Sequence, residues 1–162
     1  MDTHDFIARY GSIYEHSPWV AELVAPIAAE VSDGQRLAEL MADCVDNADN
    51  ERQLVLIRAH PDLAGKAQIA GDLTEDSTAE QASAGLDRCT RVQYEKFQAL
   101  NDAYKDKFGF PFVMAVRGSN CTEILDAFSA RLKNEYDVEF ETALEEIHKI
   151  ARLRIAAMER EE

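Results

Sequence analysis

Residues 110–116 read FPFVMAV, and this stretch decides the fold class. It is the one run in the 162-residue chain whose residues favour an extended backbone. A lone strand leaves its backbone N–H and C=O groups without a partner strand to pair them. We therefore interpret the run as an apolar connection and predict an all-α protein, a multi-helix bundle.

Elsewhere in the chain, apolar residues recur at helical spacing. Between residues 37 and 45 they follow the i, i+3, i+4, i+7, i+8 pattern of an amphipathic helix. Ser17 and Pro18 predict a capped helix start, Pro26 a break and Gly109 a helix end. Comparable patterns predict further helices near residues 6–10, 19–27, 50–59, 97–108, 124–132 and 140–158, and one from about Thr78 to 86.

Composition and charge exclude several classes of protein. With 17 basic and 31 acidic residues the net charge is −14, which argues against nucleic acid and anionic membranes as partners. No apolar run approaches the roughly 20 residues that a membrane span requires. At this length we predict a single domain over residues 1–162.

The three cysteines, Cys44, Cys89 and Cys121, are widely spaced and form no C-x-x-C pair. An odd number at such spacing predicts a chain with neither a disulfide framework nor a structural zinc site. This cysteine usage suits a reducing compartment, and the acidic N-terminus lacks an apolar signal core. We therefore predict a cytoplasmic protein.

The segment RAHPDLAG at residues 58–65 places His60 where a helix ends. Asp49 or Asn50 can cap the start of this helix, and Pro61 stops it because proline disfavours helical backbone in the residue before it. His60 is then either a structural residue at a helix terminus or a titratable group on a rigid mount. Histidine is the usual general acid or base in enzymes, so the second interpretation stays open.

Residues 77–81 read STAEQ, the pattern of a capping box. Ser77 would accept from the backbone N–H of Glu80, and the Glu80 side chain would reach back to Ser77. The same residues could serve a ligand, because helix N-termini present free N–H groups that suit carboxylates. Glu80 could also turn toward His60 and hold its tautomer.

The stretch 112–117 allows two interpretations as well. In the first, structural interpretation, the surrounding aromatic residues make it an apolar turn packed on the core. Alternatively, its extended backbone leaves N–H and C=O groups for a planar, amide-rich ligand. Arg117, which follows directly, and Lys66, which follows the His60–Pro61 turn, could supply positive charge for an anionic ligand.

Three motifs in this order, HPDLAGKA, STAEQASAGLD and LNDAYKDKFGFPFVMAVRG, resemble the 2-oxo-4-hydroxy-4-carboxy-5-ureidoimidazoline (OHCU) decarboxylases of urate breakdown. YGSIYEHSPWVAE near the start and LEEIHKIARLRI near the end fit the same family, so the resemblance covers almost the whole chain. It implies an all-helical homodimeric carboxy-lyase that needs no metal or organic cofactor and forms (S)-allantoin and CO2.

The resemblance also implies a set of site residues. His60 would be the catalytic acid/base and Glu80 would orient it or tune its charge. The substrate-binding residues would be Pro61, Ser77, Thr78, Ala79, Glu80, Gln81, Phe112, Val113, Met114, Ala115 and Val116. To these we add Arg117 for its positive charge and its place directly after this stretch. Two alternatives stay open at this point: a non-catalytic helical domain that binds ureides or partner proteins, and a lyase acting on another ureide.

Overall fold

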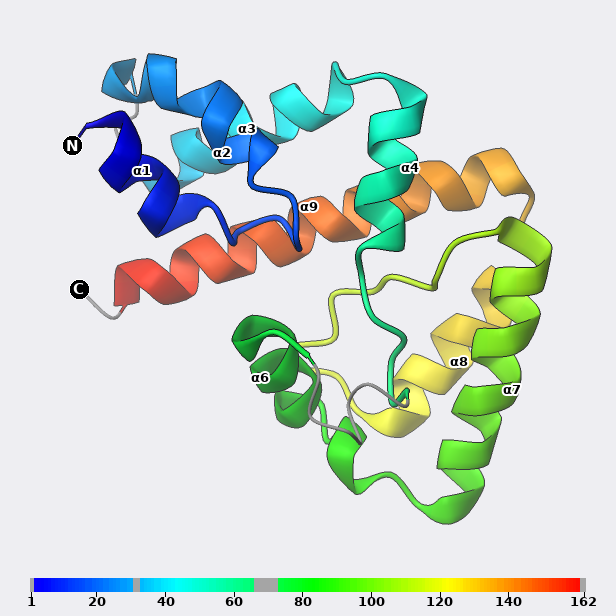
Figure 1. The fold of residues 1–162 in the computed structure, drawn as a ribbon. Coiled ribbons are helices and arrows are strands. Elements are labelled where there is room, and N and C mark those ends of the chain that lie inside the picture. Colours follow the sequence, from blue (N-terminus) through cyan, green and yellow to red (C-terminus); the bar gives the residue numbers. More distant parts are fainter. Residues whose placement is uncertain (1, 31–32, 66–72, 161–162) are drawn as a thin grey trace. The chain divides into compact units, whose positions relative to one another are not determined.

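The computed structural model describes residues 2–30, 33–65 and 73–160 of the chain. Within these ranges it contains eight α-helices, two short 3-10 helices and no strand, which confirms the all-α prediction (Figure 1). Residues 111–116 form neither helix nor strand, as expected of a connection. The elements are α1 (Thr3–Tyr10), α2 (Trp19–Val24), η1 (Ala25–Glu30), α3 (Gly34–Asp46), α4 (Asn50–Arg58), α6 (Glu75–Ser83), η2 (Leu86–Arg88), α7 (Arg91–Phe108), α8 (Cys121–Arg131) and α9 (Tyr136–Arg160).

The chain divides into two compact units. The first consists of residues 1–60 and 144–162, and the second of residues 61–143. The long helix α9 contributes its first turns to the second unit and the remainder to the first. The single domain over residues 1–162 stays a prediction.

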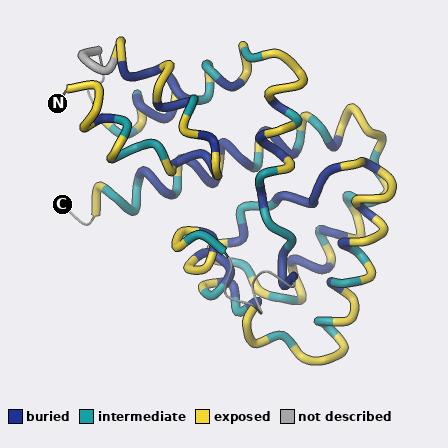
Figure 2. Tube along the Cα trace, viewed as in Figure 1, coloured by how far each residue is buried: buried dark blue, intermediate teal, exposed yellow. Residues whose placement is uncertain are grey.

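In the first unit, α3 shows how the apolar stripe builds a core. Asp33 caps its first turn, accepting from the backbone N–H of Arg36 at 2.9 Å. The stripe residues Leu37, Leu40, Met41 and Val45 are all buried, and Figure 2 shows buried and exposed positions alternating along the helices. Gly34 lets the start of α3 approach the end of α9 closely, because an added Cβ would lie 2.9 Å from Ile155 Cγ2. The local pattern and the packing therefore agree here.

An aromatic cluster forms the core of the second unit. The ring of Tyr104 on α7 packs edge-on against those of Phe112 and Phe128, with centroids 5.5 and 5.8 Å away. Phe112 stacks on Phe128 at 3.9 Å, which fixes the start of the extended stretch against α8. The Tyr104 hydroxyl donates to the buried carboxylate of Glu139 at 2.7 Å, so the polar end of this large side chain is satisfied.

Helix boundaries set by proline and glycine are confirmed, whereas one predicted cap is wrong. The helix α2 gives way to η1 just before Pro26, and α7 ends at Gly109 in the left-handed conformation at φ 75°. Ser17, however, does not cap α2. Pro18 occupies the N-cap position, and the Ser17 hydroxyl donates to the Glu15 carbonyl at 2.9 Å.

The prediction of a chain without disulfides is also wrong. Cys89, just after η2, is bonded to Cys121, the first residue of α8, and their Cα atoms lie 6.2 Å apart. Both sulfurs lie near the Gly85 carbonyl oxygen. The two cysteines are 32 residues apart in the sequence, so their spacing did not predict that they would meet. Cys44 is the remaining free thiol. The cysteine argument for a reducing compartment therefore no longer holds.

Candidate active site

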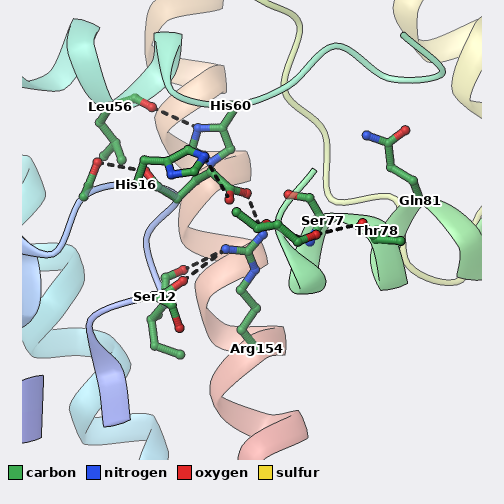
Figure 3. Close-up of polar contacts among 12 residues, drawn as sticks. Ser12, His16, Leu56, His60, Ser77, Thr78, Gln81 and Arg154 are labelled. Carbon is green, nitrogen blue, oxygen red and sulfur yellow. Dashed lines mark hydrogen bonds and ion pairs between the residues drawn. The ribbon is translucent and has the colours of Figure 1, made fainter. Parts of the chain in front are cut away.

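His60 lies in the first unit, two residues beyond the end of α4. Asp49 caps this helix by accepting from Arg52 N at 2.7 Å, and the His60 backbone N–H donates to Ile57 O at 3.2 Å. The His60 ring nitrogen Nδ1 lies 2.9 Å from the Leu56 carbonyl oxygen (Figure 3). A carbonyl only accepts, so Nδ1 carries the hydrogen and Nε2 of the neutral ring carries the lone pair. His60 is thus held in the tautomer of a general base.

Burial controls the protonation of this ring. It lowers the pKa of His60 from 6.5 to about 4, since the imidazolium loses hydration. The bond to the Leu56 carbonyl and the negative charge of Glu15 oppose this shift, and the positive charge of Arg154 adds to it. His60 is consequently neutral at pH 7 and ready to accept a proton.

A buried ion pair accompanies His60 in the same unit. Arg154 on α9 donates from Nη2 to Glu15 Oε2 at 3.0 Å, and both side chains are almost completely buried. Arg154 Nη1 also donates to the carbonyls of Ser12 and Ile13 at 3.4 and 3.3 Å (Figure 3). These contacts fasten the segment between α1 and α2 to α9.

Sequence reasoning missed both members of this pair. A signal was present, because Arg154 lies on the apolar stripe of α9 with Ile147, Ile150 and Ala151. A charge on the buried face of a helix needs a partner or a function. Glu15 gives no comparable signal, since it lies in a connection outside any periodic segment.

In the second unit, the segment after Pro61 is held by side-chain amides. Ala64 adopts a positive φ of 51°, and its N–H donates to Gln81 Oε1 at 3.0 Å. Gln81 Nε2 donates to the Asp62 carbonyl at 3.3 Å. Gln98 donates to the Ala64 carbonyl at 2.7 Å and Asn101 to the Leu63 carbonyl at 3.0 Å. The turn following His60–Pro61 is therefore fixed by polar contacts along its backbone.

The predicted capping box at Ser77 is wrong. Thr74 is the N-cap of α6, and its hydroxyl accepts from the Ser77 backbone N–H at 3.2 Å. Starting the helix three residues earlier than the box requires puts Glu75 and Asp76 in the first turn, where the dipole favours acidic side chains. Ser77 and Glu80 consequently lie inside the helix.

One face of α6 is polar and buried. Ser77, Glu80 and Gln81 are one turn apart and all buried. Thr78 and Ala79 are exposed, and the Thr78 hydroxyl donates to the Thr74 carbonyl at 2.8 Å. Of the five predicted residues on this helix, three therefore share an inward face and two do not.

The predicted stretch 112–116 is extended and anchored by α8. Arg131 Nη1 donates to the Val113 carbonyl at 2.6 Å, and its guanidinium lies 4.3 Å from the centroid of the Phe112 ring. Phe112, Val113 and Val116 are buried, whereas Met114 and Ala115 are half-buried. In the described parts of the chain, the N–H groups of Val113 and Met114 donate to no protein acceptor.

Of the two cationic residues predicted to contact the substrate, the structure describes one. Arg117 is exposed in the turn after the stretch, and Lys66 lies outside the described residues.

His60 belongs to the first unit, while Pro61 and the other predicted residues belong to the second. Across residues 2–30, 33–65 and 73–160, no three His, Cys, Asp or Glu side chains are grouped as metal ligands would be.

Comparison with known proteins settles the family. A family model for OHCU decarboxylase matches residues 1–156. An OHCU decarboxylase from Haloferax volcanii is 47% identical over 156 residues, which cover 96% of this chain and 90% of that protein. The chain belongs to the OHCU decarboxylase family. It is a carboxy-lyase family, and the resemblance inferred from the three motifs is confirmed.

Two crystal structures support the family assignment at the level of the fold. An (S)-allantoin synthase is 32% identical with a TM-score of 0.78, covering 97% of this chain and 50% of that chain. An OHCU decarboxylase in the presence of (S)-allantoin is 27% identical with a TM-score of 0.66, covering 79% of this chain and 82% of that chain. The all-helical architecture is therefore that of the OHCU decarboxylase family.

Proposed function

We propose that this protein converts OHCU to (S)-allantoin and CO2 in urate breakdown, without a metal or organic cofactor. Membership of the OHCU decarboxylase family supports the reaction, and the likeness to an (S)-allantoin synthase supports the product. The single structural observation that carries the mechanism is His60, buried, neutral and with its Nε2 lone pair free of the Leu56 bond.

The substrate itself supplies the electron sink. When the bond to the carboxylate breaks, CO2 leaves and the electron pair moves into the adjacent ring C=N bond, whose nitrogen takes a proton. The enol-like product then loses its hydroxyl proton, and the ureido-bearing carbon gains one on a single face. Each turnover thus takes up one proton from solvent.

His60 manages these proton transfers in the proposed mechanism. Because its neutral ring presents Nε2 as an acceptor, it removes the hydroxyl proton of the enol-like product and then gives a proton to the ureido-bearing carbon. The imidazolium that forms is then a strong acid, since burial disfavours the charged ring. Such general acid–base catalysis contributes about 10²–10⁴-fold to a rate.

Glu80 is the second proposed catalytic residue, and Ser77 and Gln81 are proposed to bind the ureido group. Their shared buried face on α6 supports this assignment. The Gln81 amide uses one lone pair and one N–H on the loop after Pro61. An amide offers two of each, so one lone pair and one N–H remain for the substrate. Pro61, Thr78 and Ala79 complete the proposed set of substrate-binding residues in this part of the chain.

The ring of the substrate is proposed to bind along residues 112–116. The unused N–H groups of Val113 and Met114 support this assignment, because a ring carbonyl would satisfy them. Positive charge for the carboxylate is proposed to come from Arg117, as the sequence predicts, and from Arg154. The positive charge of Arg154 lowers the pKa of His60, which supports this second assignment.

Assembly and location remain proposals as well. We propose a homodimer that acts in the cytoplasm on a small-molecule substrate, without nucleic acid or membrane as partner. No helix in the described residues has the length and apolarity needed to cross a membrane.

The activity is tested by generating OHCU from urate in situ and following the circular dichroism of allantoin with and without the protein. We expect faster formation of the (S) enantiomer. His60→Asn should fold normally, because the Asn amide can still donate to the Leu56 carbonyl, and should lose about 10²–10⁴-fold in rate. His4→Asn, on the exposed face of α1, is the matched control.

Racemic allantoin at the spontaneous rate in the presence of wild-type protein would refute the proposed activity. Near-wild-type turnover by folded His60→Asn would refute the role of His60 and leave the activity in place.

A further inference from the structure

A second histidine of the first unit lies in a buried hydrogen-bonded chain that the proposed mechanism does not use. The Tyr14 hydroxyl lies 2.8 Å from His148 Nδ1, and His148 Nε2 lies 2.9 Å from Asp46 Oδ1. An ionised carboxylate only accepts, so Nε2–H donates to Asp46 and Nδ1 accepts from Tyr14. His148 is thus held in the opposite tautomer to His60, and the three residues form one directed chain.

The outer end of this chain lies where a carboxylate is otherwise unfavourable. Asp46 is the last residue of α3, and the helix dipole disfavours negative charge at a C-terminus. Its side chain is 58% exposed, whereas Tyr14 and His148 are buried. Burial, followed by the charge of Asp46, raises the pKa of Tyr14, so its hydroxyl stays protonated and remains a donor. The position of Asp46 is therefore better explained by its bond to His148 than by α3 itself.

The inner end of the chain holds the segment that carries Glu15. Tyr14 directly precedes Glu15, and Glu15 pairs with Arg154 on the same helix that carries His148. His16 follows with a φ of 47°, which non-glycine residues rarely adopt and which persists only when neighbours fix the backbone. Two side chains thus tie this segment to α9, one through Tyr14 and one through Glu15.

We propose that Asp46, His148 and Tyr14 are positioning residues that hold the Glu15–Arg154 pair beside His60. The inference rests on the proposed function, because it assigns the chain a part in keeping His60 dry and neutral. None of the three touches the reacting atoms. Without the Tyr14 hydroxyl, the segment loses one of these two side-chain ties to α9 and keeps the bonds from Arg154 to the Ser12 and Ile13 carbonyls. Both the ion pair and the shielding of His60 from water should then loosen.

The test compares Tyr14→Phe with Tyr10→Phe, which removes a hydroxyl that accepts from Arg9 Nε at 3.0 Å in the same unit and outside the chain. The titration midpoint of His60 is measured by NMR on histidine-labelled protein, together with kcat and KM. In Tyr14→Phe we expect the midpoint to rise by about one pH unit and kcat to fall roughly tenfold. KM should change little, and Tyr10→Phe should match wild type.

A second pair of variants keeps the inference testable if Tyr14→Phe does not fold. The amide oxygen of His148→Asn can still accept from the Tyr14 hydroxyl, whereas His148→Ala offers no acceptor. We therefore expect His148→Asn to retain more of the wild-type kcat and a lower His60 midpoint than His148→Ala.

An unchanged His60 midpoint and kcat in folded Tyr14→Phe would overturn the inference, even if its melting temperature falls. The hydrogen bonds among Asp46, His148 and Tyr14 would then have only a structural role. The NMR comparison does not depend on turnover. A wild-type protein without OHCU decarboxylation would therefore refute the proposed function, while the midpoints of the variants would still decide the positioning role.

Discussion

In His60, the position of the ring hydrogen is fixed and the protonated form of the ring is disfavoured. The bond from Nδ1 to the Leu56 carbonyl selects the tautomer, and burial keeps the ring neutral at pH 7. An exposed imidazole would be partly protonated near its ordinary pKa of 6.5 and would offer no fixed lone pair. Its buried position at the end of α4 therefore keeps the His60 ring neutral and able to act as a base at every pH above about 5.

Stability should report the lowered pKa of His60 directly. Unfolded His60 takes up its proton near pH 6.5 and folded His60 near pH 4, so the unfolded state binds more protons in between. The contribution to the free energy of unfolding is full above pH 6.5 and is lost as pH falls toward 4, by about 3 kcal/mol in total. Chemical denaturation of wild type and His60→Asn at several pH values isolates this term by difference. Parallel pH curves for the two proteins would contradict it.

Glu80 can be tested separately from helix capping, because Thr74 and not Ser77 caps α6. Glu80→Gln keeps the size and hydrogen-bonding capacity of the side chain while removing its charge. We expect turnover of OHCU to fall at least about tenfold with little change in melting temperature. Glu75→Gln, in the exposed first turn of the same helix, is the matched control. If activity of Glu80→Gln falls only in step with its melting temperature, the role of Glu80 is structural.

At the scale of elements, α6 places three of the predicted site residues on one buried face. With Thr74 as the cap, Ser77, Glu80 and Gln81 share the buried face, and Gln81 reaches the loop after Pro61. The far end of the helix leads through Gly85, at φ 72°, to the disulfide between Cys89 and Cys121. The disulfide thereby links the residue after η2 to the start of α8, the helix whose Arg131 holds the extended stretch.

Loss of this disulfide should destabilise the protein. Closing a loop of 32 residues restricts the unfolded chain, and removing such a bond costs about 2–4 kcal/mol in the free energy of unfolding. Cys89→Ser should show this loss in urea denaturation, and reductant should lower the midpoint of wild type but not that of the variant. Cys44→Ser, which removes the free thiol, serves as control. Equal midpoints for oxidised and reduced wild type would contradict the prediction.

At the scale of the whole molecule, charge opposes the proposed function. A net charge of −14 repels an anionic substrate at long range, so binding must depend on cations and N–H groups close to the carboxylate. Short-range contacts of this kind are less affected by salt than the general repulsion, which weakens beyond a Debye length of about 10 Å at 0.1 M.

Raising salt from low to physiological concentration should therefore lower KM for OHCU or leave it unchanged. Arg117→Gln should raise KM several-fold with little effect on stability, because its side chain is exposed. Arg88→Gln, an exposed arginine paired with its neighbour Asp87, is the matched control. A KM that rises steeply with salt would show attraction in place of repulsion, and an unaltered KM in Arg117→Gln would remove Arg117 from the site.

The sequence by itself determined the features that depend on neighbours within a few residues. Helical period placed the stripe of α3, Pro26 ended α2, Gly109 ended α7, and the lone apolar run of 110–116 excluded a sheet. The three motifs also identified the family, which comparison confirmed. Periodicity, proline and glycine act locally through backbone geometry, so they can be evaluated without coordinates.

Only the tertiary structure decided which groups meet across long separations. Thr74 and Ser77 are both possible caps by local rules, and the structure has Thr74 as the cap with Ser77 buried inside α6. Glu15 and Arg154 pair across 139 residues, and Cys89 reaches Cys121 across 32. The tautomer of His60 likewise depends on where its ring meets the Leu56 carbonyl. Such contacts follow from how helices pack, and packing depends on the whole chain at once, which no local pattern records.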